Sequence, residues 1–153
     1  MRPLAFVDLE TTGATATHDR ITEIGIVEVD ADGTVREWQQ LVNPGMRIPP
    51  FIEQLTGISN DMVADAPPFE TVAAETMKRL EGRLFIAHNA RFDYGFLKNE
   101  FKRLGITFRA SVLCTVKLSR TLFPEHKRHN LDSLIERHDL QAAARHRALA
   151  DAQ

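Results

Sequence analysis

The sequence predicts an α/β protein in which three strands come first and helices then alternate with short strands. Residues 4–42 contain three stretches with strand character, separated by a polar loop and a turn. Residues 67–104 contain two amphipathic helical stretches on either side of one short apolar stretch. This order is typical of a mixed sheet flanked by helices. The 153 residues fit one domain with a proper core.

The first three strands are expected to form an antiparallel meander. The apolar run at residues 4–7 is typical of a buried strand, and residues 14–20 form a polar stretch that we expect to be a mobile loop. Residues 21–29 alternate apolar and polar side chains, and the turn sequence at 30–33 joins them to a third strand at 35–42.

The rest of the chain is expected to alternate helices with short strands. Gly57 and Gly105 stand where a glycine commonly follows a helix. The expected order is helix 49–55, helix 67–81, strand 84–87, helix 90–104, strand 108–113, helix 115–122 and a further helix that Asn130 can cap.

Two carboxylates close the first strand. Side chains along a strand alternate between its faces, so Asp8 and Glu10 point the same way. Two anions beside an apolar core repel each other and are costly to bury. A divalent cation relieves this repulsion, and an all-oxygen donor set suits Mg²⁺ or Mn²⁺. A solvated strand end is the plainer interpretation of these two residues taken alone.

A third acid lies on the helix at 90–104. Phe96, Leu97, Phe101 and Leu104 form one apolar stripe at 100° per residue, and Asp93 falls in the middle of it. Asp93 is also placed where the helix dipole favours a negative charge. A carboxylate on a core-facing stripe needs a partner, so we favour a role for Asp93 in the site.

The tail adds His146 and Asp151. Inside one helix their side chains would be about 140° apart, so they converge only if His146 precedes the helix that carries Asp151. Residues 124–129 form a basic, histidine-containing loop that, with Lys117 and Arg120, is suited to contact phosphates. A solvated loop is the plainer interpretation of this segment, and a metal site is the least favoured.

Composition limits the classes of partner. A formal charge of −2 gives no global attraction to nucleic acid, although a site that holds a few nucleotides needs only local charge. The single cysteine, Cys114, excludes an intramolecular disulfide and favours a reducing compartment. No apolar stretch approaches the length of a membrane span, so we expect a cytoplasmic protein without a membrane partner.

Three motifs together resemble those of the DEDDh (DnaQ-like) family of 3′–5′ exonucleases, which includes the proofreading epsilon subunit of bacterial DNA polymerase III. They are Phe-Val-Asp-Leu-Glu-Thr-Thr-Gly at 6–13, His-Asn-Ala-Arg-Phe-Asp-Tyr-Gly-Phe-Leu at 88–97 and His-Arg-Ala-Leu-Ala-Asp-Ala at 146–152. Residues 55–58 and 124–131 are also similar to family segments, so the resemblance covers almost the whole chain.

The resemblance implies a ribonuclease H-like fold, with a central mixed five-stranded sheet flanked by helices. It also implies two Mg²⁺ or Mn²⁺ ions about 4 Å apart. Asp8 would bridge both ions, Glu10 and Asp151 would complete one site, and Asp93 would hold the second ion through water. His146 would be the general base, since a histidine is largely neutral at working pH.

The resemblance further implies how a strand end is held. The backbone of Thr11 and Thr12 would meet the terminal 3′ hydroxyl, Ile58 and Phe92 would stack on terminal bases, and Asn89 would help to hold the strand. The expected substrate is a single-stranded or frayed DNA 3′ end. The expected products are nucleoside 5′-monophosphates, and the expected setting is proofreading or repair beside a polymerase or repair assembly.

Two alternatives remain open at this point. An exonuclease that trims RNA or short oligonucleotides would use the same residues. A non-catalytic module that docks to a polymerase or repair complex would keep the fold and lose a ligand or the base. Residues 1–153 are expected to be one exonuclease domain, either a fragment or the N-terminal domain of a longer polypeptide. Its last helix is expected to be truncated, because the chain stops two residues after Asp151.

Overall fold

The computed structural model describes residues 2–115. Its elements follow one another as β1 (Leu4–Thr11), β2 (Ile21–Val29), β3 (Val35–Leu41), α1 (Pro50–Thr56), α2 (Asn60–Ala64), α3 (Phe69–Leu80), β4 (Leu84–Ala87), α4 (Ala90–Arg103) and β5 (Val112–Cys114). The predicted elements from residue 116 onward, including the basic loop, lie outside the described residues.

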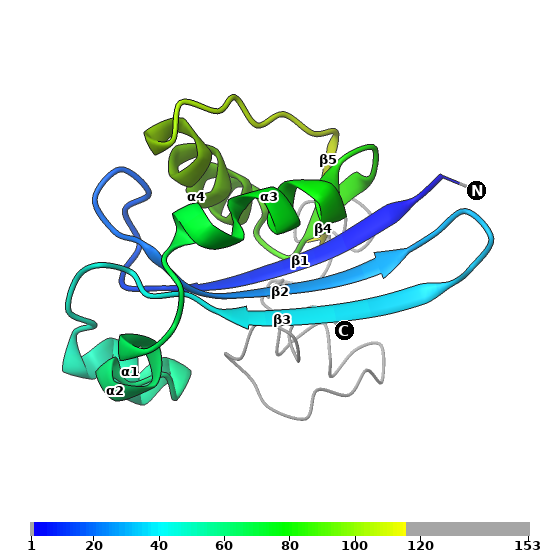
Figure 1. Cartoon of the computed structure of the whole chain (residues 1–153). Coiled ribbons are helices and arrows are strands. Elements are labelled where there is room, and N and C mark those ends of the chain that lie inside the picture. Colours follow the sequence, from blue (N-terminus) through cyan, green and yellow to red (C-terminus); the bar gives the residue numbers. More distant parts are fainter. Residues whose placement is uncertain (1, 116–153) are drawn as a thin grey trace, which may run out of the picture.

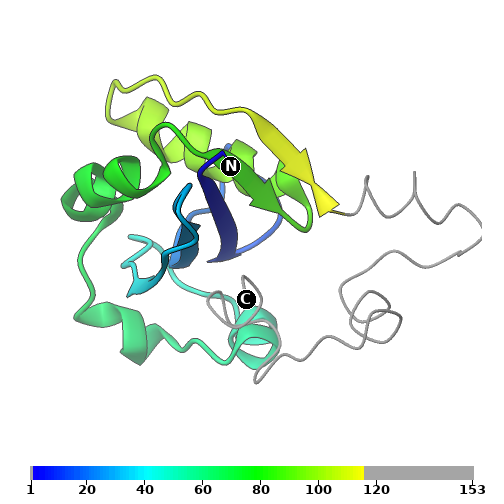
Figure 2. The same ribbon diagram turned by 90° about the vertical axis from the view of Figure 1, so that its right-hand side faces the viewer.

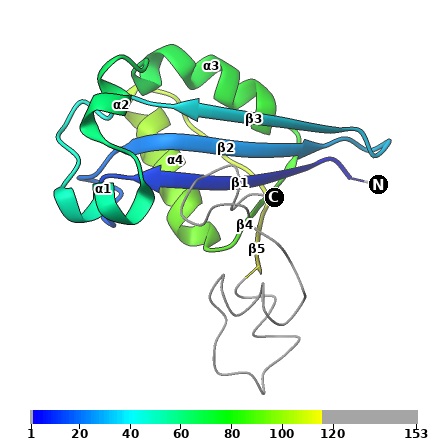
Figure 3. The ribbon, with the colours of Figure 1, turned by 90° about the horizontal axis from the view of Figure 1, so that it is seen from below.

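The five strands form one mixed sheet in the order β3-β2-β1-β4-β5. β1, β2 and β3 are antiparallel neighbours, while β4 runs parallel to β1 and β5 runs parallel to β4. Helices α3 and α4 cover one face of the sheet (Figure 1), and the view from below shows the meander in front of them (Figure 3). The predicted meander and mixed five-stranded sheet are confirmed.

The core lies between the sheet and the two covering helices. Strand β1 contributes Ala5, Val7 and Leu9 on alternate positions, which is the period of a strand with one face buried. Aromatic rings fill the space beside α4: Phe101 packs edge-on against Phe69 at 5.0 Å and stacks on Phe108 at 5.2 Å between ring centroids. This packing fixes α4 against α3 and against the segment before β5.

Some boundaries differ from the predictions. Strand β5 covers only Val112–Cys114, because pairing with β4 begins at Val112 opposite Phe85. Phe108 instead packs into the core from the segment before the strand. Leu104 leaves the buried stripe of α4, since it is the residue that follows the helix, and it is exposed.

Helix α2 was missed by the sequence prediction. Ser59 begins it by accepting a hydrogen bond from the Met62 amide at 3.2 Å. Helices α1 and α2 lie beside the end of the sheet where β1 stops (Figures 1 and 3), and Figure 2 views the sheet from the opposite end. No helix in residues 2–115 is long and apolar enough to cross a membrane.

Candidate active site

Asp8 and Glu10 lie together on the face of β1 that points away from α3 and α4. Val7 and Leu9 belong to the core on the opposite face, so the alternation that the sequence predicted holds through this strand. The pairing of β1 with β2 shifts register between Glu10 and Thr11. Such a bulge re-aims side chains and is common beside functional sites.

A further carboxylate stands directly opposite Glu10. Glu23 on β2 is the cross-strand partner of Glu10 and is completely buried. The Gln39 side-chain amide donates a hydrogen bond to Glu23 at 2.8 Å. The sequence analysis did not single out Glu23, because the alternation of residues 21–29 does not give the register that brings it to Glu10.

Asp93 is held against the strand that carries the two acids. It lies in the first turn of α4, is only 3% exposed, and accepts a hydrogen bond from the Leu9 backbone N–H. Strand β4 pairs with β1 only from Leu4 to Phe6, so the later residues of β1 have no strand neighbour on that side. Asp93 therefore reaches the backbone between Asp8 and Glu10.

Burial raises the pKa of Asp93 from 3.8 to about 7, and the backbone hydrogen bonds to its carboxyl oppose this rise. A carboxyl with this pKa gains from a nearby cation, which favours its charged form. The oxygen donors of Asp8, Glu10 and Asp93 suit Mg²⁺ or Mn²⁺. Within residues 2–115, however, no three acidic, histidine or cysteine side chains stand close enough to hold a metal ion by themselves.

The loop after β1 is organised around Thr12 and Asp19. The Thr12 hydroxyl donates to Asp19 at 3.1 Å, and the Thr12 amide donates to the Arg20 carbonyl at 2.9 Å. A Cβ on Gly13 would lie 2.4 Å from an Asp19 carboxylate oxygen, so a larger residue there would displace the Asp19 side chain. The loop that was predicted to be mobile is thus held by internal hydrogen bonds. The amide of Thr12, expected at a 3′ hydroxyl, is committed to the loop.

A cavity of about 280 Å³ separates this loop from the start of α4. Its lining consists of small, aromatic and polar side chains: Ala14, Ala16, Asn89, Arg91, Phe92 and Phe96. Phe92 packs against Phe96 with 4.7 Å between ring centroids. The Asn89 side chain makes no capping bond to α4, although the residue occupies the cap position. Two predicted substrate-binding residues, Asn89 and Phe92, therefore line one cavity.

Ile58 lies elsewhere than expected. It is completely buried with Ile48 and Val63 in a separate small core beneath α1 and α2. The left-handed Gly57 and the start of α2 at Ser59 bracket Ile58 closely. The structure therefore places no Ile58 surface where a base could stack. His146, Asp151, Lys117, Arg120 and the loop at 124–131 lie outside the described residues.

Comparisons with known proteins agree on one family. A family model described as "Exonuclease" matches residues 5–153. The PolC-type DNA polymerase III of Caldanaerobacter subterraneus subsp. tengcongensis is 40% identical over 146 residues, which are 95% of this chain and 10% of that protein. The 3′-5′ exonuclease DinG of Bacillus subtilis is 42% identical over 149 residues, 96% of this chain and 16% of the relative. The chain thus spans a small part of these relatives.

Solved structures show the same fold. Exonuclease X in complex with 5′ overhanging duplex DNA superposes with a TM-score of 0.79 at 30% identity, covering 97% of this chain and 84% of that one. Exonuclease I of E. coli with a dT13 oligonucleotide gives a TM-score of 0.86 at 19% identity, covering 99% of this chain and 39% of the other. The expected ribonuclease H-like fold is confirmed.

Proposed function

Because this chain belongs to the exonuclease family, we propose that it is a metal-dependent 3′–5′ exonuclease of the DEDDh type. It hydrolyses the terminal phosphodiester of a DNA strand and releases nucleoside 5′-monophosphates. The observation that carries the proposal is the hydrogen bond from Leu9 to Asp93, which ties an acid of α4 to the strand segment with Asp8 and Glu10. The cavity lined by Phe92 lies at the start of the same helix.

The metal-binding residues follow from the donors and the family pattern. Asp8, Glu10 and Asp93, with Asp151 from the tail, would hold two Mg²⁺ or Mn²⁺ ions. Such ions relieve negative charge on the attacking and leaving oxygens. The shortage of ligands within residues 2–115 agrees with a site that needs Asp151. His146 would take the proton of the attacking water.

The strand end is proposed to enter the cavity between the loop and α4. Phe92 offers a ring on which a base can stack without regard to its identity, and Asn89 offers beside it a side-chain amide that does not cap α4. The exposed Arg91 supplies a positive charge at the same cavity for a backbone phosphate. The Exonuclease X complex supports DNA as the substrate. The similarity to a PolC-type DNA polymerase III supports a role in association with a DNA polymerase.

Digestion of end-labelled strands tests the proposal. With Mg²⁺ or Mn²⁺ the wild type should shorten 5′-labelled single-stranded DNA stepwise from its 3′ end, and EDTA should stop it. Asp8→Ala should lower the rate at least about 100-fold, because charge stabilisation at the reacting phosphate is lost. Asp32→Ala, at the exposed β2–β3 turn, is the matched control and should digest at the wild-type rate.

Other outcomes would reject parts of the proposal. Internal cuts, or activity that survives Asp8→Ala, would contradict the mechanism. Faster digestion of an RNA strand of the same sequence would favour the RNA-trimming alternative. If a version with a longer C-terminus binds DNA but leaves it intact, the protein is a docking module.

A further inference from the structure

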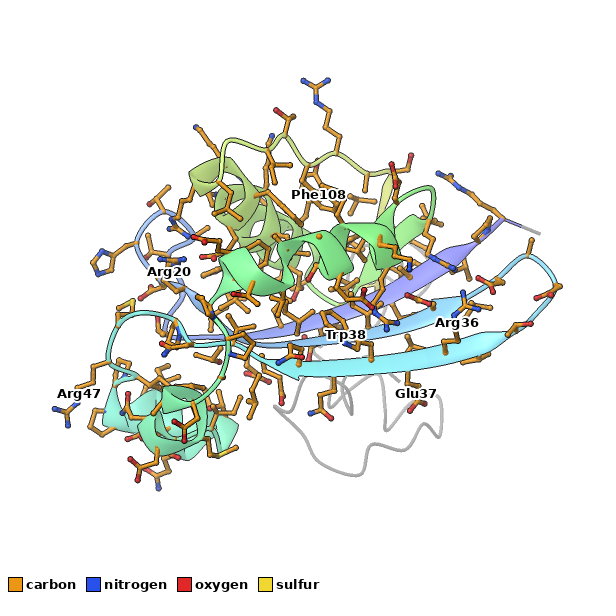
Figure 4. All side chains as sticks on the ribbon, viewed as in Figure 1. Arg20, Arg36, Glu37, Trp38, Arg47 and Phe108 are labelled. Carbon is orange, nitrogen blue, oxygen red and sulfur yellow. The ribbon has the colours of Figure 1, made fainter. Side chains whose placement is uncertain are left out.

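A buried carboxylate on α4 ties the loop after β1 to the helix that carries Asp93. Glu100 is 2% exposed and accepts two hydrogen bonds from the Arg20 guanidinium, at 2.5 Å from Nε and 3.1 Å from Nη2. It is also paired with Arg103 one turn further along α4. Figure 4 shows Arg20 where the loop returns to the sheet beneath α4. A bidentate pair of this kind fixes orientation as well as distance.

Arg103 carries the same contact into the loop. Its Nη2 donates to the Ala16 carbonyl at 3.2 Å and to the Thr17 carbonyl at 3.3 Å. Ala16 lines one wall of the cavity, and Phe92 and Phe96 of α4 line the other. Through Arg103, Glu100 therefore holds one wall of the cavity at a set distance from the opposite wall.

The two buried acids of α4 hold the two sides of the loop. Asp93 and Glu100 are seven residues apart, which places them on the same side of the helix and about 10 Å apart along it. Asp93 holds the Leu9 amide before the loop, and Glu100 holds Arg20 after it. The Arg20 amide also donates to the Thr12 hydroxyl at 3.1 Å, so a shift of Arg20 would displace Thr12.

We propose that Glu100 is a positioning residue for the strand end. By holding Arg20 and Arg103, it fixes residues 12–20 over the start of α4 at the spacing that admits a terminal nucleotide. Within residues 2–115, Glu100 pairs with Arg20 and Arg103 and with none of the proposed metal ligands. It is therefore expected to set the affinity for the strand end and to leave the chemical step unchanged. This inference rests on the proposed exonuclease function.

The chain offers a matched control for Glu100. Glu28 is also a buried carboxylate paired with two arginines, Arg36 and Arg79. It lies opposite Ala5, near the other end of the β1–β2 pair from Glu10. Glu28→Gln therefore removes a similar charge from a similar setting without touching the loop or the cavity.

The experiment compares Glu100→Gln, Arg103→Met and Glu28→Gln in the full chain. Steady-state digestion of a single-stranded DNA oligonucleotide gives KM and kcat, and hydrogen exchange reports on the amides of residues 14–20. Glu100→Gln should raise KM about tenfold with kcat within about twofold, since it loosens substrate positioning alone. Amide exchange in the loop should rise about tenfold as well. Arg103→Met keeps the Arg20–Glu100 pair, and should raise KM about threefold.

Three results would overturn the inference. They are a fall in kcat with KM unchanged in Glu100→Gln, unchanged exchange in residues 14–20, or an equal rise of KM in Glu28→Gln. If Glu100→Gln does not fold, the KM and loop exchange of Arg103→Met test the inference instead. The Arg103 side chain is 29% exposed, and without it Glu100 stays paired with Arg20. A wild type that leaves DNA intact would reject the proposed function, and the exchange data would then support or refute the loop contact separately.

Discussion

Replacing Asp93 with asparagine should stabilise the metal-free protein at alkaline pH and have little effect at acid pH. Burial raises the Asp93 pKa from 3.8 to about 7, so the folded protein holds a proton that the unfolded chain releases. The stability that comes from this proton is complete below about pH 4 and is lost as the pH rises through about 7. Asparagine is neutral throughout and keeps an oxygen that accepts the Leu9 hydrogen bond.

The size of the effect follows from the pKa. The pKa of Asp93 rises by about three, and each unit of pKa corresponds to about 1.4 kcal/mol. Ionised Asp93 therefore lowers the free energy of unfolding by about 4 kcal/mol at pH 8. Asp93→Asn should therefore raise the free energy of unfolding by up to about 4 kcal/mol at pH 8 and by about 1 kcal/mol at pH 4.5. The same variant should lose exonuclease activity, because a proposed metal ligand has lost its charge.

Urea unfolding in EDTA at several pH values between 4.5 and 8 measures this difference. Asp61→Asn is the control, since Asp61 also lies in a first helical turn but is exposed. It should change the free energy of unfolding by less than about 0.5 kcal/mol at every pH. A constant offset between Asp93→Asn and wild type at all pH values, or a wild type that is more stable at pH 8, would refute the reasoning.

Three further predictions concern the loop and the cavity. Gly13→Ala should lower the free energy of unfolding by about 1–3 kcal/mol, because its Cβ would overlap the Asp19 carboxylate. Gly95→Ala, with open space around it inside α4, should instead raise the free energy of unfolding by about 0.5–1 kcal/mol, and thermal unfolding measures both. Thr12→Val should cost about 1–3 kcal/mol in urea unfolding, since the hydroxyl that bonds Asp19 is lost; an unchanged midpoint would argue against this loop geometry. Phe92→Ala should raise the KM for single-stranded DNA at least about fivefold through lost stacking, and an unchanged KM would remove Phe92 from the substrate site.

Local patterns predicted much of the fold because they are set by side-chain periodicity. The alternation through β1 correctly placed Asp8 and Glu10 on one face, opposite the core residues Val7 and Leu9. The helical stripe of α4 correctly placed Asp93 among buried residues. The roles of these acids in metal binding stay predictions, as do those of His146 and Asp151.

The family resemblance for Ile58 and the strand pattern for residues 108–113 failed, because the environment of these side chains depends on distant segments. Ile58 follows a family-like Thr-Gly pair, yet it packs inward against Ile48 and Val63 because the chain around it folds into a small core of its own. Likewise, Phe108 carries strand-like neighbours, but β5 begins four residues later, where pairing with Phe85 becomes possible.

The sequence by itself determined that Asp8 and Glu10 share one face of their strand and that Asp93 lies on the core-facing side of its helix. It also determined that this helix follows the strand at residues 84–87. Only the tertiary structure decided what those acids meet. The register of β1 with β2 sets Glu23 opposite Glu10, and the packing of α4 brings Asp93 to the Leu9 amide. The contact between Arg20 and Glu100 joins residues 80 apart in the chain. Such pairings depend on strand register and helix packing, which no local repeat in the sequence encodes.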